Sequence, residues 1–275
     1  MTELRIIILC GRSPRHLYVA NRLCCAGRPI AIVQETGSEK VWEKFIKLAL
    51  HPRSLKRKCW RFLRDRRRYA GGKEARFFFG TDQPFLERKE LLFEVPHINH
   101  QSLLDLVQRT QPDLIAVFGT SLIKNDLLEM GKKGIVNLHG GPSPHYRGAD
   151  CTFWALFNGE PEHVGCTIHF IDKGIDTGRL IAHVFPEVKE GDDELTLFWR
   201  AVKRSSDVYS EFINRLGNGE FFGLQQKEKG SLYQVKDRTW KKERELKKKM
   251  GNGLLSGVHL PLRVKWYGSS QKGLE

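Results

Sequence analysis

The sequence predicts an α/β protein in which a Rossmann-like, mostly parallel sheet carries helices on both faces and a small C-terminal extension follows. Two observations lead to this fold class. Short apolar runs typical of buried strands alternate with segments whose apolar residues recur at helical spacing. The chain has 275 residues, of which 40% are hydrophobic and 28% are charged. This length and composition suit one large globular domain or two small ones.

The expected strands are short and rich in branched apolar residues. The first, over 4–10, is apolar without interruption, as a strand buried on both faces should be. The last two are expected to pair as a hairpin-like unit. The expected strands cover residues 4–10, 30–34, 114–118, 135–139, 165–171 and 179–184.

The expected helices fall between these strands. In 15–26, apolar residues recur at helical spacing until Gly27 and Pro29 end the pattern. Alternation of this kind places a ligand site beyond the carboxyl ends of the strands. The expected helices cover residues 15–26, 41–50, 101–110, 124–130, 149–157 and 195–216.

Two segments account for the formal net charge of +14. Residues 52–68 hold nine Lys and Arg against one acid, and residues 227–249 hold ten against four. We therefore expect a domain over 1–217 with a basic insertion near 52–76, and then a basic extension over 218–275. Such segments attract nucleic acid, anionic membranes or small anions, although a solvated insertion and tail are the plainer explanation.

No apolar run approaches the roughly 18 residues that span a bilayer. The apolar run at the N-terminus, over 6–10, is shorter than a signal-peptide core. The six cysteines form no C-x-x-C pair, which suits reduced thiols. These features predict a cytoplasmic protein without a transmembrane segment.

Several common sites are absent from the sequence. There is no P-loop motif, and the turn after the first expected strand has a single glycine, which argues against a Rossmann cofactor turn. His163, Cys166 and His169 are three residues apart, so strand geometry turns neighbouring members to opposite faces. No metal site is expected there.

Asn137, His139 and Asp176 form the constellation that suits chemistry. Asn137 and His139 are two apart at the end of an expected strand and so share a face, and Asp176 lies in a glycine-flanked turn. An amide, a protonated imidazole and a carboxylate suit acyl transfer to an amine. The amide and imidazole would stabilise an oxyanion, and Asp176 would raise the pKa of His139 and assist proton removal. A polar strand end beside a tight turn is the structural alternative.

The stretch 112–186 resembles the formyltransferases that use 10-formyltetrahydrofolate. That family has a strand with Asn-x-His, a loop ending in Tyr/Trp-Arg-Gly, a helix ending in Gly-Glu, and then G-x-T-x-H and D-x-G-x-D-x-G. The matching segments here are Asn137-Leu138-His139, Tyr146-Arg147-Gly148, Trp154 to Gly159-Glu160, Gly165-Cys166-Thr167-Ile168-His169 and Asp172 to Gly178. The resemblance implies that Asn137, His139 and Asp176 are catalytic.

The resemblance also implies a folate site, with the pterin between 118–122 and the 172–176 turn and held largely by backbone groups. The side chains of His169 and Asp172 are expected to support the turn rather than take part in chemistry. The implied folate-binding residues are Phe118, Gly119, Thr120, Ser121, Leu122, Asp172, Gly174 and Ile175.

Departures from the family pattern indicate which class of acceptor amine the chain uses. Glycinamide ribonucleotide formyltransferases have a glycine-rich loop where this chain has 12–16, and methionyl-tRNA formyltransferases have a C-terminal barrel larger than the residues after 216. The loop 139–144 and the segment 230–237 instead resemble N-formyltransferases that act on nucleotide-linked amino sugars. The acceptor implied is the primary amine of such a sugar.

The diphosphate of a nucleotide-linked sugar would be bound by arginines through charge-assisted hydrogen bonds. His16 is a further candidate, while Trp154 is expected in the core. The predicted substrate-binding residues are Arg12, Arg15, Ser143, Tyr146 and Arg147.

Other readings stay open from the sequence. The amine can belong to an aminoacyl-tRNA, an amino acid or a carrier-bound molecule, or the chain can be a non-catalytic protein that binds nucleic acid. Trp60, Phe62 and Leu63 lie among the charges of 52–68. That segment can therefore be an amphipathic helix on a membrane surface. It can also bind tRNA or a carrier-bound substrate, or it can be a solvent-exposed helix. A homodimer is a further expectation.

Overall fold

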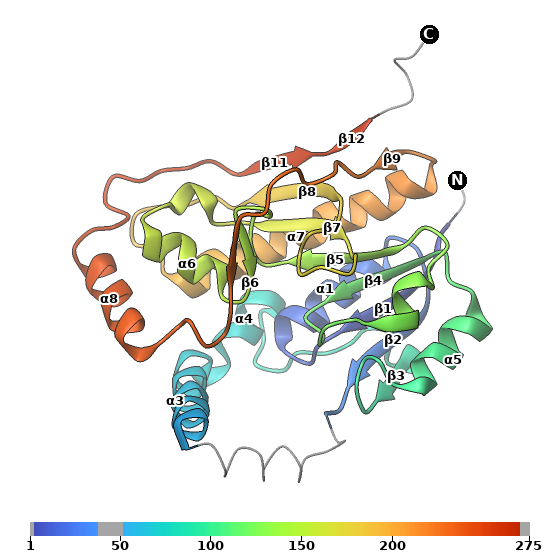
Figure 1. Cartoon of the computed structure of the whole chain (residues 1–275), viewed down its shortest axis with the longest axis horizontal. Coiled ribbons are helices and arrows are strands. Elements are labelled where there is room, and N and C mark those ends of the chain that lie inside the picture. The colour runs from blue at the N-terminus through green and yellow to red at the C-terminus, as the bar shows by residue number, and fades with distance from the viewer. Residues whose placement is uncertain (1–2, 38–51, 270–275) are drawn as a thin grey trace.

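The computed structural model describes residues 3–37 and 52–269 of the chain. Eight of its strands form one sheet, in the order β11-β8-β7-β5-β4-β1-β2-β3 (Figure 1). The parallel part consists of β3 (Leu92–Val95), β2 (Arg28–Glu35), β1 (Arg5–Cys10), β4 (Leu114–Phe118) and β5 (Ile135–His139). The antiparallel part consists of β7 (Cys166–Phe170), β8 (Leu180–Phe185) and β11 (Arg263–Trp266). The predicted mostly parallel α/β sheet is confirmed.

The central strands are buried on both faces, which explains their unbroken apolar sequence. In β1, Ile6 and Ile8 pack into one core, and Ile7 and Leu9 pack into a second core on the opposite face. Helices α1 (Pro14–Cys24), α4 (Lys73–Phe79) and α7 (Glu194–Gly217) contribute to the first core, and α5 (Gln101–Thr110) contributes to the second. The helices thus cover both faces of the sheet, as predicted.

Tyr209 ties α7 to the strands that precede the site. Its side chain is fully buried, and its hydroxyl donates to the Val136 carbonyl at 2.7 Å while accepting from the Val117 amide at 3.2 Å. Tyr209→Phe should lower the free energy of unfolding by about 1–3 kcal/mol, because these buried backbone groups lose their partner. Denaturant unfolding measures this loss. Tyr18→Phe is the matched control, since the Tyr18 hydroxyl makes no hydrogen bond within the described residues; equal losses in both variants would contradict the account.

The C-terminal residues fold back onto the body of the protein. Strand β10 (Ser231–Tyr233) pairs with β6 (Tyr146–Gly148), β12 (Gly268–Ser269) pairs with β9 (Phe221–Phe222), and β11 joins the main sheet. Helices α6 (Cys151–Asn158) and α8 (Trp240–Gly251) share a third core. The sequence did not predict α8, because Leu246 is the only residue of that helix that is fully buried. The predicted boundary between 217 and 218 stays a prediction.

Most of the other predicted elements lie close to their observed bounds. The predicted helix over 124–130 is a short 3₁₀ helix, and β3 and α4 were not predicted. The predicted helix over 41–50 lies outside the described residues. The basic segment forms helix α3 (Pro52–Arg68). The 3₁₀ helices are η1 (Ala70–Gly72), η2 (Lys89–Leu91), η3 (Asn125–Glu129) and η4 (Pro161–His163). None of the described helices combines the length and apolar character needed to cross a bilayer.

Candidate active site

The carboxyl end of β5 and the turn after β7 bring the predicted triad together. His139 Nδ1 lies 3.4 Å from Asp176 Oδ2, and Asn137 Nδ2 lies 3.3 Å from His169 Nε2. His169 Nε2 in turn lies 3.5 Å from Asp176 Oδ1. Asn137 and His169 are direct neighbours in the β5–β7 register. His169 therefore contacts both Asn137 and Asp176, as the supporting role predicted for its side chain would require.

Asp176 is held in place by backbone geometry and by two other segments. Its φ angle is +52°, in the left-handed region. The Gly148 amide donates to Asp176 Oδ2 at 2.8 Å. The Gln226 side-chain amide donates to the backbone carbonyls of Asp176 at 3.1 Å and Gly178 at 2.7 Å. The sequence did not predict a role for Gln226, because no residue pattern around position 226 indicates that its side chain reaches the turn that contains Asp176.

The protonation of His139 differs from the prediction. Burial lowers the pKa of His139 below its ordinary value and His169 lowers it further, while Asp176 opposes both without reversing the shift. Burial also acts to raise the pKa of Asp176, but His139, His169 and the Gly148 amide outweigh it and hold that pKa well below its usual range. Asp176 thus acts to raise the pKa of His139, as expected, but burial outweighs it, so the expectation that His139 is protonated was wrong for the free protein. The site holds a neutral imidazole beside a carboxylate.

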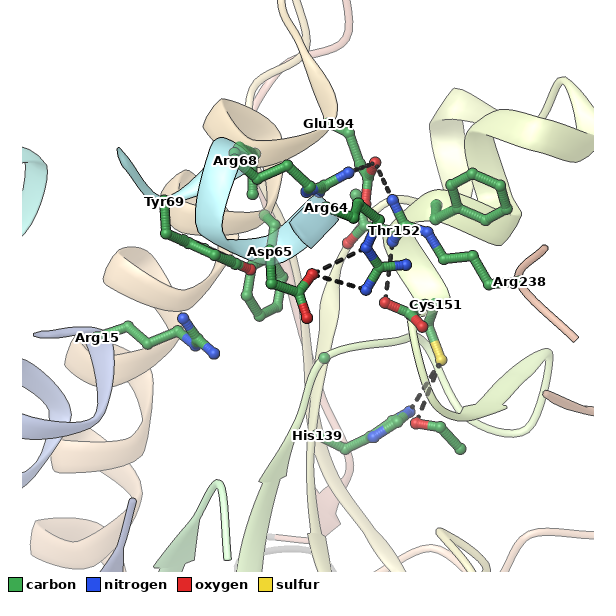
Figure 2. Close-up of a pocket in the computed structure, with 16 residues that line it drawn as sticks. Arg15, Arg64, Asp65, Arg68, Tyr69, His139, Cys151, Thr152, Glu194 and Arg238 are labelled. Carbon is green, nitrogen blue, oxygen red and sulfur yellow. Dashed lines mark hydrogen bonds and ion pairs between the residues drawn. The ribbon is translucent and has the colours of Figure 1, made fainter. Parts of the chain in front are cut away.

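The second nitrogen of His139 also faces an acceptor. His139 Nε2 lies 3.1 Å from the Tyr146 carbonyl oxygen. The same nitrogen lies 3.5 Å from Cys151 Sγ (Figure 2). Burial raises the pKa of the Cys151 thiol well above its ordinary value, so this sulfur is not a ready nucleophile. Because both imidazole nitrogens face oxygen atoms, a second proton on His139 would find a partner on either side.

The triad divides between two cavities. His139 lines the first, which has a volume of about 240 Å³ and is shown in Figure 2. Asn137 and Asp176 line the second, which has a volume of about 180 Å³. Reacting groups bound in the two cavities would therefore approach the triad from different sides.

The first cavity is here called the arginine-lined cavity, after Arg15, Arg64, Arg68 and Arg238. The first is on α1, the next two are on α3, and Arg238 precedes α8. The non-arginine residues of its wall are Asp65, Tyr69, His139, Gly140, Gly148, Asp150, Cys151, Thr152, Phe153, Glu194, Leu195 and Phe198.

Each of these arginines has a carboxylate partner. Arg238 bonds Asp150 and Glu194 at 2.9 Å and Glu243 at 2.7 Å, and its side chain is only 2% exposed. Arg68 shares Glu194 at 2.9 Å (Figure 2). Similarly, Arg15 pairs with Glu74 and Arg64 with Asp65. The positive charge of the wall is therefore largely balanced within the protein.

Arg238→Met should lower the free energy of unfolding by roughly 3–5 kcal/mol, because it leaves Asp150 without its cation and leaves Glu194 with Arg68 alone. Thermal or denaturant unfolding measures the loss. Glu243→Gln is the control, since it leaves Arg238 with two carboxylate partners and should cost less. Equal stability of Arg238→Met and the wild type would show that the network is not required for the fold.

Of the predicted substrate-binding residues, Arg15 lines this cavity and the other four do not. Arg12 is exposed and pairs with Glu94. Arg147 is buried and donates to the carbonyls of Ile175 and Gly230, because β6 is covered by β10.

The remaining candidates are also turned away from the cavity. Ser143 is fully buried, and the buried Tyr146 donates its hydroxyl to Glu160. The His16 ring fits between Gly11 and Gly119, where burial and Arg15 lower its pKa to about 3. Trp154 is buried in the third core.

The predicted folate-binding residues divide in the same way. Five of them line the second cavity together with Val117, Ile123, Asn137, His169, Ile171 and Asp176; they are Thr120, Ser121, Leu122, Gly174 and Ile175. Phe118 and Gly119 instead pack against the His16 ring. Asp172 accepts from the Gly174 amide at 2.9 Å and the Thr177 hydroxyl at 2.6 Å, which supports the turn.

The order of motifs and their geometry agree with a match to a known family. The family model described as Formyl transferase covers residues 70–213, more than half of the chain. The chain belongs to the formyl transferase family. This confirms the family that the motifs from Asn137 to Gly178 predicted. Within the described residues, no group of three or more His, Cys, Asp or Glu side chains is arranged to hold a metal ion.

Curated relatives of this formyl transferase family member share part of its length. GDP-perosamine N-formyltransferase of Brucella melitensis is 32% identical over 136 residues, which are 49% of this chain and 52% of that protein. Methionyl-tRNA formyltransferase of Caldanaerobacter subterraneus is 30% identical over 136 residues, 49% of this chain and 44% of that protein. The chain thus spans about half the length of the curated relatives it matches.

Solved structures share its fold. A sugar N-formyltransferase from Shewanella has a TM-score of 0.55 at 15% identity, over 88% of this chain and 86% of that one. Glycinamide ribonucleotide transformylase 1 from Symbiobacterium toebii has a TM-score of 0.54 at 20% identity, over 84% of this chain and 95% of that one. At these identities the likeness is one of fold.

Proposed function

We propose that the protein moves a formyl group from 10-formyltetrahydrofolate to the primary amine of a nucleotide-linked amino sugar. The observation that carries this proposal is the contact between His139, which lines the arginine-lined cavity, and Asp176, which lines the second cavity together with Asn137. Family membership supports formyl transfer, and the relative named GDP-perosamine N-formyltransferase supports a nucleotide-linked acceptor.

The second cavity fits the folate. Val117, Leu122, Ile171 and Ile175 form apolar walls, and Leu122 and Ile175 are 53% and 42% exposed although they are aliphatic. A flat heteroaromatic ring covers apolar surface of this kind. Bound there, the folate would supply the formyl carbon beside Asn137 and Asp176.

The chain's own groups then have separate tasks. The Asn137 amide donates a hydrogen bond to the formyl oxygen as negative charge develops on it. The neutral His139 accepts, directly or through water, the proton that the amine releases as its bond to the formyl carbon forms. The proton then passes to the donor nitrogen as the bond from that nitrogen to the formyl carbon breaks, so that tetrahydrofolate leaves. Asp176 faces His139 Nδ1 at 3.4 Å and stabilises the imidazolium that results. No nucleophilic side chain is needed, because the amine attacks directly.

The arginine-lined cavity is the proposed site for the acceptor. His139, Tyr69 and Phe198 line it, and the Arg15 guanidinium lies 5.6 Å and 5.7 Å from the centres of the Tyr69 and Phe198 rings. Because the arginines are already paired, their hydrogen-bonding groups would be shared between carboxylates and the diphosphate. Arg15 is the predicted substrate ligand that this placement retains.

Release of tetrahydrofolate tests the proposal. The purified protein is mixed with 10-formyltetrahydrofolate and a panel of nucleotide-linked 3-amino and 4-amino sugars, with charged initiator tRNA as the competing acceptor. Release with one sugar and not with tRNA is the expected result. Release with tRNA alone would mean that the acceptor is an aminoacyl-tRNA and not an amino sugar. Salt-dependent binding of RNA without binding of folate would mean that the chain is a nucleic-acid-binding protein and not an enzyme.

Two further properties belong to this proposal. A folate donor and a nucleotide-linked acceptor are metabolites of the cytoplasm, which supports a cytoplasmic location. A homodimer is proposed as the assembly, and light scattering of the purified protein at several concentrations would distinguish it from a monomer.

A further inference from the structure

Helix α3 docks on the protein through a charged side. Arg64 lies 3.2 Å from Glu243 and its guanidinium lies 5.3 Å from the centre of the Trp60 ring. Arg68 lies 2.9 Å from Glu194. The side chains of Arg64 and Arg68 are 12% and 20% exposed. The ion pairs of α3 are thus turned inward.

The opposite side of α3 presents apolar residues to solvent. Leu55, Cys59, Phe62 and Leu63 follow the i, i+4, i+7 and i+8 spacing of one helical stripe. All four are exposed, and the values for Leu55, Phe62 and Leu63 are 39%, 65% and 53%. A surface helix of a globular protein ordinarily buries such a stripe and exposes its charges. In α3 this arrangement is inverted, so the stripe lacks a partner within the described residues.

Cations border this apolar stripe. Lys56, Lys58 and Arg67 flank it, and Arg66 lies within the stripe at helical spacing from Phe62. All four cations are exposed, and none forms an ion pair within the described part of the chain.

Helix α8 adds to the same end of the molecule (Figure 1). It is joined to α3 through Glu243, which pairs with Arg64. Trp240, at the start of α8, is 49% exposed. The exposed cations of α8 are Lys241, Arg244, Lys247 and Lys248.

We propose that α3 binds the surface of an anionic lipid bilayer, with the Leu55–Phe62–Leu63 stripe in the headgroup region. A bilayer surface accepts apolar side chains and attracts the bordering cations at the same place. A nucleic acid would attract the cations through its phosphates, but it would leave the aliphatic stripe in water. The coincidence of the two features on one helix side therefore favours lipid.

The stripe and the arginine-lined cavity use different sides of α3. Arg64, Asp65 and Arg68 line the cavity, whereas Phe62 and Leu63 are exposed on the other side. Binding to a bilayer thus leaves the cavity wall in place. Substitutions in the stripe should change membrane binding without changing formyl transfer.

Co-sedimentation of the full chain with vesicles tests this proposal. The vesicles are phosphatidylcholine alone, or phosphatidylcholine and phosphatidylglycerol in equal parts. We expect binding to the anionic vesicles that weakens with salt. Both Phe62→Ser/Leu63→Ser and Arg66→Gln/Arg67→Gln should weaken it by about tenfold or more.

The matched controls lie on the α5 side of the sheet and in the C-terminal segment. Arg109→Gln/Lys133→Gln removes two exposed cations, and Leu262→Ser removes an aliphatic side chain that is 45% exposed. Both should bind vesicles as the wild type does. Circular dichroism melting verifies that every variant is folded.

Three results would overturn the proposal. One is the absence of binding to anionic vesicles at low salt. Another is binding that the Phe62→Ser/Leu63→Ser change leaves intact. The third is tighter binding of an RNA duplex than of vesicles, with equal sensitivity to the Arg66→Gln/Arg67→Gln change, which would assign the surface to nucleic acid.

Discussion

Asn137→Ala should reduce kcat by about a hundredfold to a thousandfold while folate still binds. The amide of Asn137 lies at the carboxyl end of β5 and lines the second cavity, where the formyl oxygen would develop its charge. Loss of one preorganised oxyanion donor has about this effect on turnover. Tetrahydrofolate release gives kcat, and folate fluorescence titration gives the dissociation constant.

Two further variants make the Asn137 result specific. Asn218→Ala changes an exposed asparagine at the end of α7 and should leave kcat unchanged. Asn137→Asp places a second carboxylate in the cluster that contains Asp176, so it should be at least as inactive as Asn137→Ala. Wild-type turnover in Asn137→Ala would remove Asn137 from the mechanism and return the cluster to a structural role.

Much of this site follows from strand geometry that the sequence already shows. Asn137 and His139 share a face because they are two apart in β5, and the glycine-rich turn places Asp176 at the same edge of the sheet. His169 joins them because β7 runs antiparallel to β5 and pairs it with Asn137. Periodicity and turn residues are local signals, so the sequence alone predicts that these side chains lie at one edge of the sheet.

The arginine-lined cavity could not be predicted from the sequence in the same way. Arg64 and Arg68 of α3 meet Arg238 around Glu243, although Arg238 and Glu243 come from a distant segment and no periodic pattern links it to α3. Arg147 stands in the motif that predicted it, yet β10 covers β6 and turns its guanidinium to backbone carbonyls. Long-range ion pairing and strand coverage decide which arginine faces a cavity, and a single sequence shows neither.

The same limit explains the protonation of His139. The sequence shows a carboxylate near an imidazole, and this pair alone would raise the pKa of His139. It does not show that the imidazole is buried. In the structure the desolvation outweighs the carboxylate, and the net direction reverses.

The pH dependence of kcat/KM should report this reversal. A lowered pKa means that His139 is neutral above it and protonated only in more acidic solution. If neutral His139 accepts the amine proton, kcat/KM should lose its activity on the acid side with an apparent pKa below the ordinary histidine value of about 6.5. The measurement is tetrahydrofolate release at low acceptor concentration over a series of buffers of constant ionic strength.

Asp176→Asn should move that acid limb further toward low pH. Asp176 is the group that opposes the lowering of the His139 pKa, so its neutral replacement removes the opposing charge. It also removes the partner of the imidazolium, so kcat should fall by about a hundredfold to ten-thousandfold. His139→Gln should abolish the limb, because no imidazole remains to titrate at that position.

The direction of the limb separates two mechanisms. An acid limb below the ordinary histidine value that moves lower in Asp176→Asn means that His139 works as a neutral proton acceptor. A wild-type limb on the alkaline side instead, with activity lost as pH rises, would mean that His139 must be charged before the amine attacks. In that case the Asp176 carboxylate would outweigh burial once folate and acceptor are bound, and the amine proton would pass to Asp176 or to water.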